Sequence, residues 1–263
     1  MTWNDKGQTA MITGASSGIG KAFAQELARR GCHVILVARS RDRLEQLAQG
    51  LESAYGIRAL ALPADLTDPA SVDDLMTELT VRQLGVDILV NNAGFGTMGA
   101  FHQLSLERLM QEIQLNVAAL TGLTYRCIGH MLQAKNGVVI NVASMTAFQP
   151  TPYMSVYGAT KAYVLSFTEA LWAEYRDHGV RIVALCPGET RSSFHEVSGT
   201  DDLKSKRMEP EEVVQAAMKA VDQDRSSKIA GRQNYLMAQL PRFLPRRLVL
   251  NVVRGMFRSI AEK

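Results

Sequence analysis

Short apolar runs alternate along the chain with longer segments whose apolar residues recur every three or four positions. The short runs, rich in Val, Ile, Leu and Ala, predict buried strands, and the longer segments predict amphipathic helices. Their strict alternation predicts parallel βαβ units and therefore an α/β fold, a three-layer, Rossmann-type doubly wound parallel sheet with helices on both faces. The predicted strands are residues 10–13, 33–38, 59–62, 87–91, 138–142 and 181–185, and the predicted helices are residues 19–30, 41–55, 69–84, 106–131 and 153–177.

The positive charge is concentrated at the C-terminal end of the chain. Residues 1–231 are predicted to form one domain, because no linker rich in Pro, Gly or Ser divides the first 190 residues. Residues 232–263 form a basic extension with seven Lys or Arg and one acidic residue, and after Pro245 they predict an amphipathic helix with arginines opposite a broad apolar face. Such a helix suits docking on the protein itself or on a second subunit, and it equally suits reversible binding to an anionic membrane. The apolar face comprises Leu248, Val249, Leu250, Val252, Val253, Met256, Phe257 and Ile260.

The composition is that of an ordinary globular protein. Of the 263 residues, 46% are hydrophobic and 21% charged, and the net charge of +3 is too small to predict a nucleic-acid-binding protein. No apolar stretch has the length of a signal-peptide core or a membrane span, so we expect a cytoplasmic protein. The cysteines and histidines lack the spacing of a metal site or a disulfide framework, so we expect no metal and reduced cysteines in the core. These residues are Cys32, Cys127, Cys186, His33, His102, His130, His178 and His195.

A glycine-rich turn follows the first predicted strand. Residues 13–20 read TGASSGIG, and the predicted helix begins at the end of this turn. Gly14 permits a tight turn, whereas Gly18 and Gly20 allow the backbone to approach a pyrophosphate and the helix to pack on the strand. The helix N-terminus presents its N–H groups and the positive end of its dipole to the same anion. The turn, placed between a strand and a helix at the start of the chain, therefore predicts a dinucleotide site.

The end of the second predicted strand favours NADP(H) over NAD(H). An NAD site usually has Asp or Glu at this point, which binds the ribose 2′-hydroxyl. Here Ala38 occupies that position and Arg39 follows it. A carboxylate would repel a 2′-phosphate, whereas an arginine binds it through charge-assisted hydrogen bonds, so we predict NADP(H). The alternative is a solvated basic turn that Arg39 forms with Arg41 and Arg43.

A tyrosine and a lysine four residues apart predict proton transfer. Tyr157 and Lys161 lie on one face of the predicted helix 153–177, within reach of each other. An isolated tyrosine has a pKa near 10 and is a poor acid or base at neutral pH, but a neighbouring lysine cation stabilises the phenolate and lowers that pKa. Ser144, at the end of the preceding strand, supplies a hydroxyl that can hydrogen-bond a substrate carbonyl and its developing oxyanion.

Taken in this order, the motifs resemble those of the short-chain dehydrogenase/reductase family, in its compact single-domain branch. The resemblance covers roughly residues 8–195 and rests on TGxxxGxG, NNAG at residues 91–94, a serine at 144, YxxxK at residues 157–161 and PG at residues 187–188. It implies that Ser144 orients the carbonyl, that Tyr157 is the general acid and base, and that Lys161 lowers the pKa of Tyr157 while binding the nicotinamide ribose. It also implies that Asn116 helps to hold a water molecule for a proton relay.

The same resemblance implies a set of cofactor contacts. Asp65 and Leu66 would meet the adenine, and the segment after residue 186 would frame the nicotinamide carboxamide. Ser192 stands where the family commonly has threonine, which keeps a hydroxyl at that position. The implied cofactor-binding residues are Gly14, Ser16, Ser17, Gly18, Ile19, Gly20, Arg39, Asp65, Leu66, Asn92, Ala93, Gly94, Tyr157, Lys161, Pro187, Gly188 and Thr190.

The residues near the expected pocket mouth are largely apolar, which favours a hydrophobic ketone as substrate. Apolar residues beside such loops also belong often to the core, and the resemblance leaves 3-oxoacyl thioesters, steroids, retinoids, sugars and small xenobiotic ketones open. The segment 189–208 is long, polar and rich in turn-forming residues, so we expect it to form a mobile lid. The predicted pocket residues are Phe95, Met145, Tyr153 and Phe194, with Met98, Phe148 and Met154 nearby.

The sequence therefore predicts an NADPH-dependent oxidoreductase that transfers a hydride between the nicotinamide and a carbonyl or secondary alcohol. The alternative is a non-catalytic NADP(H)-binding redox sensor, although a sensor would not need the intact proton-transfer residues. A sugar-nucleotide epimerase of the same broad fold usually has GxxGxxG and a longer chain, and neither is present. The resemblance also implies a homo-oligomer, a dimer or tetramer, with the apolar segments around residues 106–131 and 163–172 as its candidate interface.

Overall fold

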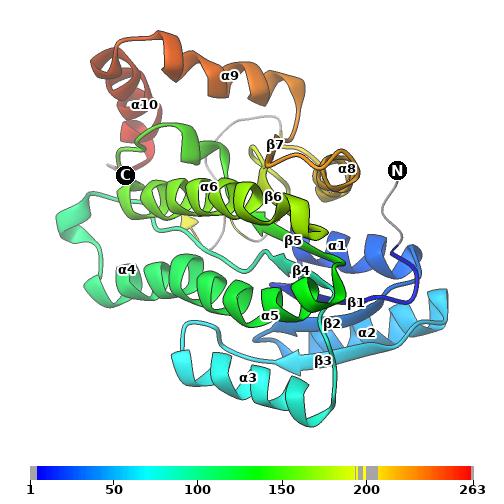
Figure 1. Cartoon of the computed structure of the whole chain (residues 1–263). Helices are drawn as coiled ribbons and strands as arrows, with labels where there is room; N and C mark the ends of the chain where they lie inside the picture. Colours follow the sequence, from blue (N-terminus) through cyan, green and yellow to red (C-terminus); the bar gives the residue numbers. More distant parts are fainter. Residues whose placement is uncertain (1–4, 193, 195–197, 200–206, 262–263) are drawn as a thin grey trace.

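A parallel sheet of seven strands forms the middle layer of the computed structural model, which describes residues 5–192, 194, 198–199 and 207–261 (Figure 1). The strand order is β3-β2-β1-β4-β5-β6-β7, and every pairing is parallel. The predicted Rossmann-type doubly wound α/β fold is thus confirmed. The strands are β1 (Thr9–Thr13), β2 (His33–Ala38), β3 (Ala59–Pro63), β4 (Ile88–Asn91), β5 (Gly137–Val142), β6 (Val180–Cys186) and β7 (Ser227–Ile229).

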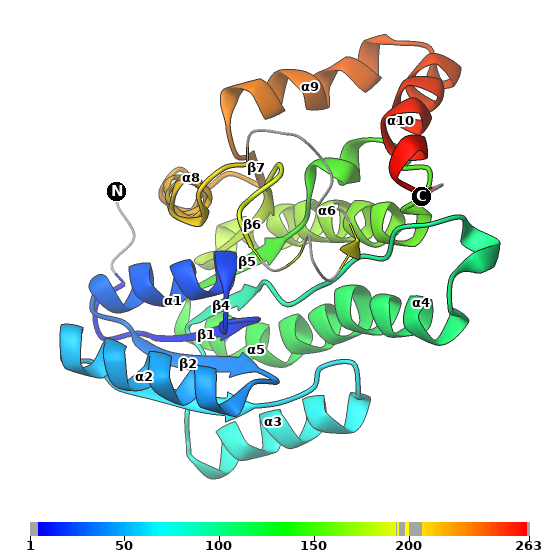
Figure 2. The ribbon, with the colours of Figure 1, turned by 180° about the vertical axis from the view of Figure 1, so that it is seen from behind.

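Helices cover both faces of the sheet. One face is covered by α1 (Gly18–Arg29), α2 (Arg41–Tyr55) and α8 (Pro210–Asp222). The other face is covered by α3 (Pro69–Val81), α5 (Leu120–Ala134) and α6 (Ser155–Tyr175), with α4 (Leu106–Ile113) in line with α5 (Figure 2). The remaining elements are the short helices η1 (Phe101–Gln103), η2 (Gln114–Ala119), η3 (Met145–Phe148) and η4 (Arg176–His178), and the C-terminal helices α9 (Arg232–Phe243) and α10 (Arg246–Ala261).

The strands are buried because both of their faces meet helices. In β1, Ala10 and Ile12 belong to the same apolar cluster as Phe23 of α1, whereas Met11 belongs to the cluster of Met131 in α5. Successive residues of one strand thus point into two different cores, which explains why the strands appear in the sequence as continuous apolar runs. The strand order reverses between β1 and β4, and ligands of such sheets bind outside the carboxyl ends of the strands at this reversal.

The prediction of one continuous α-helix over residues 106–131 is wrong, because a π-helical segment divides this region into α4 and α5. The segment between α4 and α5 is the π-helical η2, which carries Asn116. A π-helical turn contains one extra residue, and a count of apolar positions at helical spacing does not detect it. The elements β7, α8 and α9 were not predicted from the sequence. The strand β7 has three half-buried residues at the edge of the sheet, too few for an apolar run.

The C-terminal extension forms two helices where one was predicted. Val249 and Val253 of α10 are buried, so one side of this helix docks on the protein itself. Helix α9 packs against η3 and β7. The predicted domain boundary after residue 231 stays a prediction. Among the described residues, no helix has both the length and the apolar character that crossing a membrane requires.

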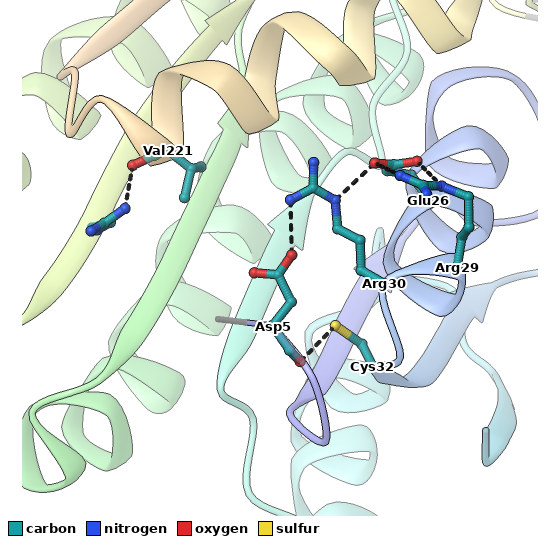
Figure 3. A network of polar contacts seen from close by, with 7 residues as sticks. Asp5, Glu26, Arg29, Arg30, Cys32 and Val221 are labelled. Atoms are coloured by element: carbon teal, nitrogen blue, oxygen red, sulfur yellow. Dashed lines mark hydrogen bonds and ion pairs between the residues drawn. The ribbon is translucent and has the colours of Figure 1, made fainter. Parts of the chain in front are cut away.

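A network of ion pairs anchors the start of the chain at the end of the sheet where the strands begin, opposite their carboxyl ends (Figure 3). Arg30 donates to Asp5 over 3.0 Å and to Glu26 over 2.8 Å, and Arg29 makes two further hydrogen bonds to Glu26, both of 2.9 Å. The Cys32 thiol donates to the Asp5 carbonyl oxygen over 3.2 Å. All three cysteines are buried and free, as expected.

Candidate active site

The glycine-rich turn follows β1 directly, at the reversal of strand order. Gly18 has a φ of +52°, in the left-handed region that favours glycine. A Cβ at Gly20 would collide with the carbonyl oxygen of Gly14, so helix and turn approach as closely as predicted. Ser17 occupies the N-cap position of α1 without a side-chain cap bond, and the first turn of α1 contains no acidic residue. This helix N-terminus therefore fits a phosphate anion.

Asn92 fastens this turn to the end of β4. Its side-chain amide donates to the carbonyl oxygens of Thr13, over 2.9 Å, and Gly14, over 3.3 Å. The Thr13 hydroxyl oxygen in turn accepts from the backbone N–H groups of Asn92 and Ala93, each over 3.0 Å. The sequence analysis assigned Asn92 and Ala93 to the cofactor site but missed Thr13. The carboxyl ends of β1 and β4 are thereby held as one unit.

The structure brings basic residues together beside the glycine-rich turn. Arg39 is exposed at the end of β2 and makes no ion pair with a described acidic residue. Between α1 and α2 a cavity of about 600 Å³ is lined by Ser16, Lys21 and Arg43, among other residues, although Arg39 does not line it. The sequence analysis gave no binding role to Lys21 or Arg43. This region thus combines the Ser16 hydroxyl, the N–H groups at the start of α1 and the cations of Lys21 and Arg43. Such a set of groups fits a phosphorylated dinucleotide.

The residues predicted to meet the adenine lie at the end of β3. Asp65 is exposed, and its carboxylate accepts hydrogen bonds from the backbone N–H and the hydroxyl of Thr67, over 3.0 and 2.8 Å. Leu66 is buried. Because Ala38 of β2 pairs with Pro63 of β3, the carboxyl ends of these two strands lie side by side. Arg39 and Asp65, which follow these strands, therefore lie at the same end of the sheet.

Ser144, Tyr157 and Lys161 lie close together between β5 and α6. Ser144 follows β5 and caps η3, with its hydroxyl oxygen accepting from the Thr146 N–H over 3.2 Å. Tyr157 and Lys161 are buried on α6. The Lys161 ammonium group donates to the Val142 carbonyl oxygen over 2.7 Å and lies 5.7 Å from the centre of the Tyr157 ring.

The electrostatics of these groups are dominated by burial. Burial raises the pKa of Tyr157 above its usual value, a hydrogen bond with Ser144 lowers it, and the charge of Glu112 adds to the rise. Burial lowers the pKa of Lys161 to about 8, against the influence of Cys186 and Glu112. The implied lowering of the Tyr157 pKa by Lys161 stays a prediction.

Asn116 lies in the π-helical η2, where its side chain is held by backbone and hydroxyl groups. Its amide donates to the Phe95 carbonyl oxygen over 2.9 Å and to the Thr160 hydroxyl over 3.1 Å. Its side-chain oxygen accepts from the Phe95 N–H over 3.2 Å. A Cβ at Gly94 would lie 2.9 Å from that oxygen and 3.5 Å from the Lys161 ammonium nitrogen, so Asn116 and Lys161 flank Gly94. The implied role in holding a water molecule stays a prediction.

Glu112 is a buried acidic residue that the sequence analysis missed. It is fully buried on α4, one turn before Asn116, and neither of its carboxyl oxygens has a hydrogen-bond partner among the described residues. Burial raises its pKa to about 7, and the neighbouring Thr97, Arg108 and Lys161 oppose this rise only in part. The available signal was an acidic residue at an apolar position of the predicted helix.

The predicted pocket residues do not all face the same way. The Phe194 ring lies 5.3 Å from the Tyr157 ring, and Met145 begins η3 directly after Ser144. Tyr153 precedes α6 with a φ of +67°, a strained conformation of the kind that gathers at functional sites. The Phe95 ring instead lies against the Arg108 guanidinium, at 4.9 Å. Of the neighbours, Met154 is buried, Met98 is half-buried, and Phe148 packs against the apolar cluster of Leu120 and Val164.

The segment after β6 links the site to the C-terminal extension. The Met145 N–H donates to the Pro187 carbonyl oxygen over 3.0 Å, and the Thr190 hydroxyl donates to the Gly188 carbonyl oxygen over 3.0 Å. A Cβ at Gly188 would collide with the Asn234 side chain of α9. Most of the expected lid, residues 193, 195–197 and 200–206, lies outside the described residues, as does His195. No three His, Cys, Asp or Glu side chains in the described part of the chain gather as a metal site requires.

Three comparisons with known proteins found similar sequences and structures. A family model described as short chain dehydrogenase matches residues 8–202. The 17-beta-hydroxysteroid dehydrogenase type 3 of Mus musculus is 37% identical over 183 residues, covering 69% of this chain and 59% of that enzyme. A short-chain dehydrogenase from Sphingobium yanoikuyae in complex with NADPH is 35% identical with a TM-score of 0.82, covering 96% of this chain and 95% of that one. The bulky-bulky ketone specific alcohol dehydrogenase from Comamonas testosteroni is 32% identical with a TM-score of 0.77, covering 89% and 92%.

Proposed function

The chain belongs to the short-chain dehydrogenase family of oxidoreductases, and on that premise we propose that it is an NADPH-dependent reductase of hydrophobic ketones. One observation carries the proposal, the convergence of Ser144, Tyr157 and Lys161 in a buried site at the end of β5. Burying polar groups of this kind costs stability, and groups with such perturbed pKa values gather at functional sites. Together they form a candidate proton-transfer site beside the candidate dinucleotide site.

The proposed chemistry assigns a separate task to each side chain. A bound nicotinamide coenzyme supplies the hydride for reduction, or takes it up in the reverse reaction. The Ser144 hydroxyl accepts from the Thr146 N–H and hydrogen-bonds Tyr157, so it lies beside the tyrosine, where its proton can turn to a substrate carbonyl oxygen. Tyr157 donates a proton to the same oxygen, and Lys161 favours the phenolate that this transfer leaves. Asn116 is fixed to the Phe95 backbone and holds η2 beside Lys161.

The preference for NADPH rests on the charge beside the glycine-rich turn. Arg39 replaces the acidic residue of an NAD site, and Lys21 and Arg43 line the adjacent cavity. Within the described part of the chain, no acidic side chain lines this cavity, so a 2′-phosphate meets cations and a hydroxyl there. The NADPH complex of the Sphingobium yanoikuyae relative supports the same choice.

The preference for a hydrophobic ketone rests on the apolar surroundings of Tyr157. Phe194 contacts its ring, and Met145 adjoins Ser144. An apolar lining with a few convergent polar groups is typical of sites for apolar substrates. The related enzymes that act on bulky ketones and hydroxysteroids support this substrate class.

The test is NADPH oxidation by the purified protein with a panel of ketones, aldehydes, 3-oxoacyl thioesters and steroids, with NADH in parallel. We expect turnover with bulky apolar ketones and a loss of about 10²- to 10⁴-fold in Tyr157→Phe, which removes the phenolic hydroxyl and with it the transferable proton. Tight NADPH binding without turnover of any ketone, in wild type and variant alike, would instead favour the redox sensor.

We also propose that the protein self-associates through α4, η2 and α6. Apolar side chains are exposed on these elements, among them Leu106, Met110, Ile113 and Tyr163. Ile113, Val117, Val156 and Tyr163 line an apolar surface pocket between them. Sedimentation velocity over a range of protein concentrations tests the proposal, and a monomer at all concentrations would refute it.

A further inference from the structure

We propose that α9 and α10 form a docking surface for an anionic lipid membrane. The surface consists of two exposed apolar rows, Leu236, Leu240 and Phe243 on α9 and Leu248, Val252 and Met256 on α10, together with the arginines of these helices. Both views of the molecule place α9 and α10 together at the end farthest from α3 (Figures 1 and 2). This inference extends the proposed function, because it brings the site to a phase in which hydrophobic ketones dissolve.

Helix α9 has its apolar face turned away from the protein. Ala238, which is 1% exposed, marks the side that packs on the body of the molecule. Leu236, Leu240 and Phe243 are spaced four and three residues apart, so they share the opposite side, and their exposed fractions are 66%, 54% and 82%. A soluble helix would carry polar residues on this side. The apolar row therefore needs a partner outside the folded chain.

Helix α10 continues the surface after the short connection at residues 244–245. Val249 and Val253 are buried against the protein, which accounts for part of its apolar face. Leu248, Val252 and Met256 are spaced four residues apart and are all about half exposed, so a second apolar row stays open. The predicted docking on the protein itself thus explains only one side of the helix.

The charge of this region selects an anionic partner. From residue 225 to residue 261 the sequence has eight Lys or Arg and no acidic residue, whereas the chain as a whole carries only +3. Arg242, Arg246 and Arg247 are exposed and form no ion pair with a described acidic residue. A second copy of the same surface would bring like charges together, whereas an anionic lipid surface attracts them and accepts the apolar rows.

The position of α9 relative to the site gives this contact a use. The side of α9 that faces the protein packs against η3, the segment that begins directly after Ser144. Its Asn234 lies against Gly188 in the segment after β6. One side of α9 thus packs beside segments of the proposed active site, while the other would lie on lipid.

The experiment is flotation of the full chain with phosphatidylcholine vesicles that contain or lack phosphatidylserine. We expect flotation with the anionic vesicles only, and loss of flotation as salt is raised. Leu240→Ser/Phe243→Ser removes apolar contact, and Arg246→Gln/Arg247→Gln removes two charges. Each arginine near an anionic surface contributes a factor of about five, so the arginine variant should bind about 30-fold more weakly.

Matched controls separate this surface from general stickiness. Val81→Ser/Tyr125→Ser removes two apolar side chains that are 74% and 80% exposed elsewhere, and Arg58→Gln/Lys135→Gln removes two exposed charges elsewhere. We expect both controls to float as the wild type does. Equal binding to neutral vesicles, equal losses in the controls, no binding at all, or self-association that Leu240→Ser/Phe243→Ser abolishes would each overturn the proposal. Flotation needs no turnover, so its outcome is independent of the assay for reductase activity.

Discussion

Lys161 lies one helical turn after Tyr157, with its ammonium nitrogen 5.7 Å from the centre of the tyrosine ring and bonded to the Val142 carbonyl oxygen. Both side chains are buried, and burial lowers the pKa of Lys161 to about 8 while it raises that of Tyr157. The fold thus holds a cation and a phenol where neither charged form is favoured by its surroundings. This arrangement suits proton transfer and is unfavourable for stability.

We expect Lys161→Met to abolish ketone reduction and to raise the free energy of unfolding at pH 7. At this pH the ammonium is charged in both the folded and the unfolded chain, so the folded protein bears the full cost of its burial. Between about pH 8 and pH 10.5 the unfolded chain binds more protons than the folded one, so the stability of the wild type rises relative to the variant across this window. The gain at pH 7 is on the order of 1–3 kcal/mol, reduced by the lost Val142 bond.

Urea denaturation of wild type and Lys161→Met at pH 7 and pH 10 measures this effect. Lys219→Met, which alters an exposed lysine of α8, serves as the control and should leave stability nearly unchanged. A Lys161→Met variant that is less stable than the wild type at pH 7 would show that the lysine supports the fold.

Glu112→Gln should make the protein more stable at pH 7 to 8. Burial raises the pKa of Glu112 to about 7, above the value of about 4.5 for an unfolded glutamate. The folded state therefore binds more protons than the unfolded state between these values, and the stability contributed by Glu112 is lost as pH rises from 4.5 through 7. The amide cannot ionise, so the pH dependence of Tm should flatten in this interval. Thermal melts from pH 4.5 to 8 test this, with exposed Glu174→Gln as control.

Burial pattern decides which elements can be predicted from the sequence. Strand β2 has the predicted bounds, residues 33–38, because helices enclose both of its faces and its residues form a continuous apolar run. Helix α2 has the predicted bounds, residues 41–55, because it buries a single apolar side. Strand β7 is half-buried at the sheet edge, and the π-helical turn at Asn116 changes the helical register without changing the apolar pattern. Neither feature leaves a trace in hydrophobic periodicity.

The candidate site divides in a similar way. Ser144, Tyr157 and Lys161 could be predicted because their order and spacing along the chain carry the chemistry. The Thr13 hydroxyl could not, because its contacts join the ends of two strands that are far apart in sequence. Contacts of this kind follow from the tertiary structure, which no local pattern specifies.

Arg39→Asp should raise the KM for NADPH far more than the KM for NADH. A charge-assisted bond to the 2′-phosphate is lost, and the new carboxylate repels that phosphate, so a rise of about 10- to 100-fold is expected for NADPH. NADH lacks the phosphate and can gain a bond from its ribose hydroxyls to the aspartate. Steady-state kinetics with both cofactors test this. Arg58→Asp makes the same charge change at an exposed position outside the proposed cofactor site and should affect neither KM.

Arg30→Met should destabilise the protein while leaving its activity intact. Arg30 bonds both Asp5 and Glu26, which are buried, at the end of the sheet opposite the proposed active site (Figure 3).

The pH dependence of this network follows from Glu26. Burial would raise the pKa of Glu26, but hydrogen bonds from Arg29 and Arg30 lower it to about 2. The stability contributed by Glu26 is therefore present above about pH 4.5 and is lost as pH falls through 2. We expect a loss of about 2 kcal/mol at pH 7, because the buried Asp5 loses its cation and Glu26 loses one of its two. The loss should be smaller in Arg29→Met, whose side chain is 58% exposed. Denaturant unfolding of both variants from pH 7 to pH 3 measures the difference, and equal losses would show that burial of the partners does not set the strength of this network.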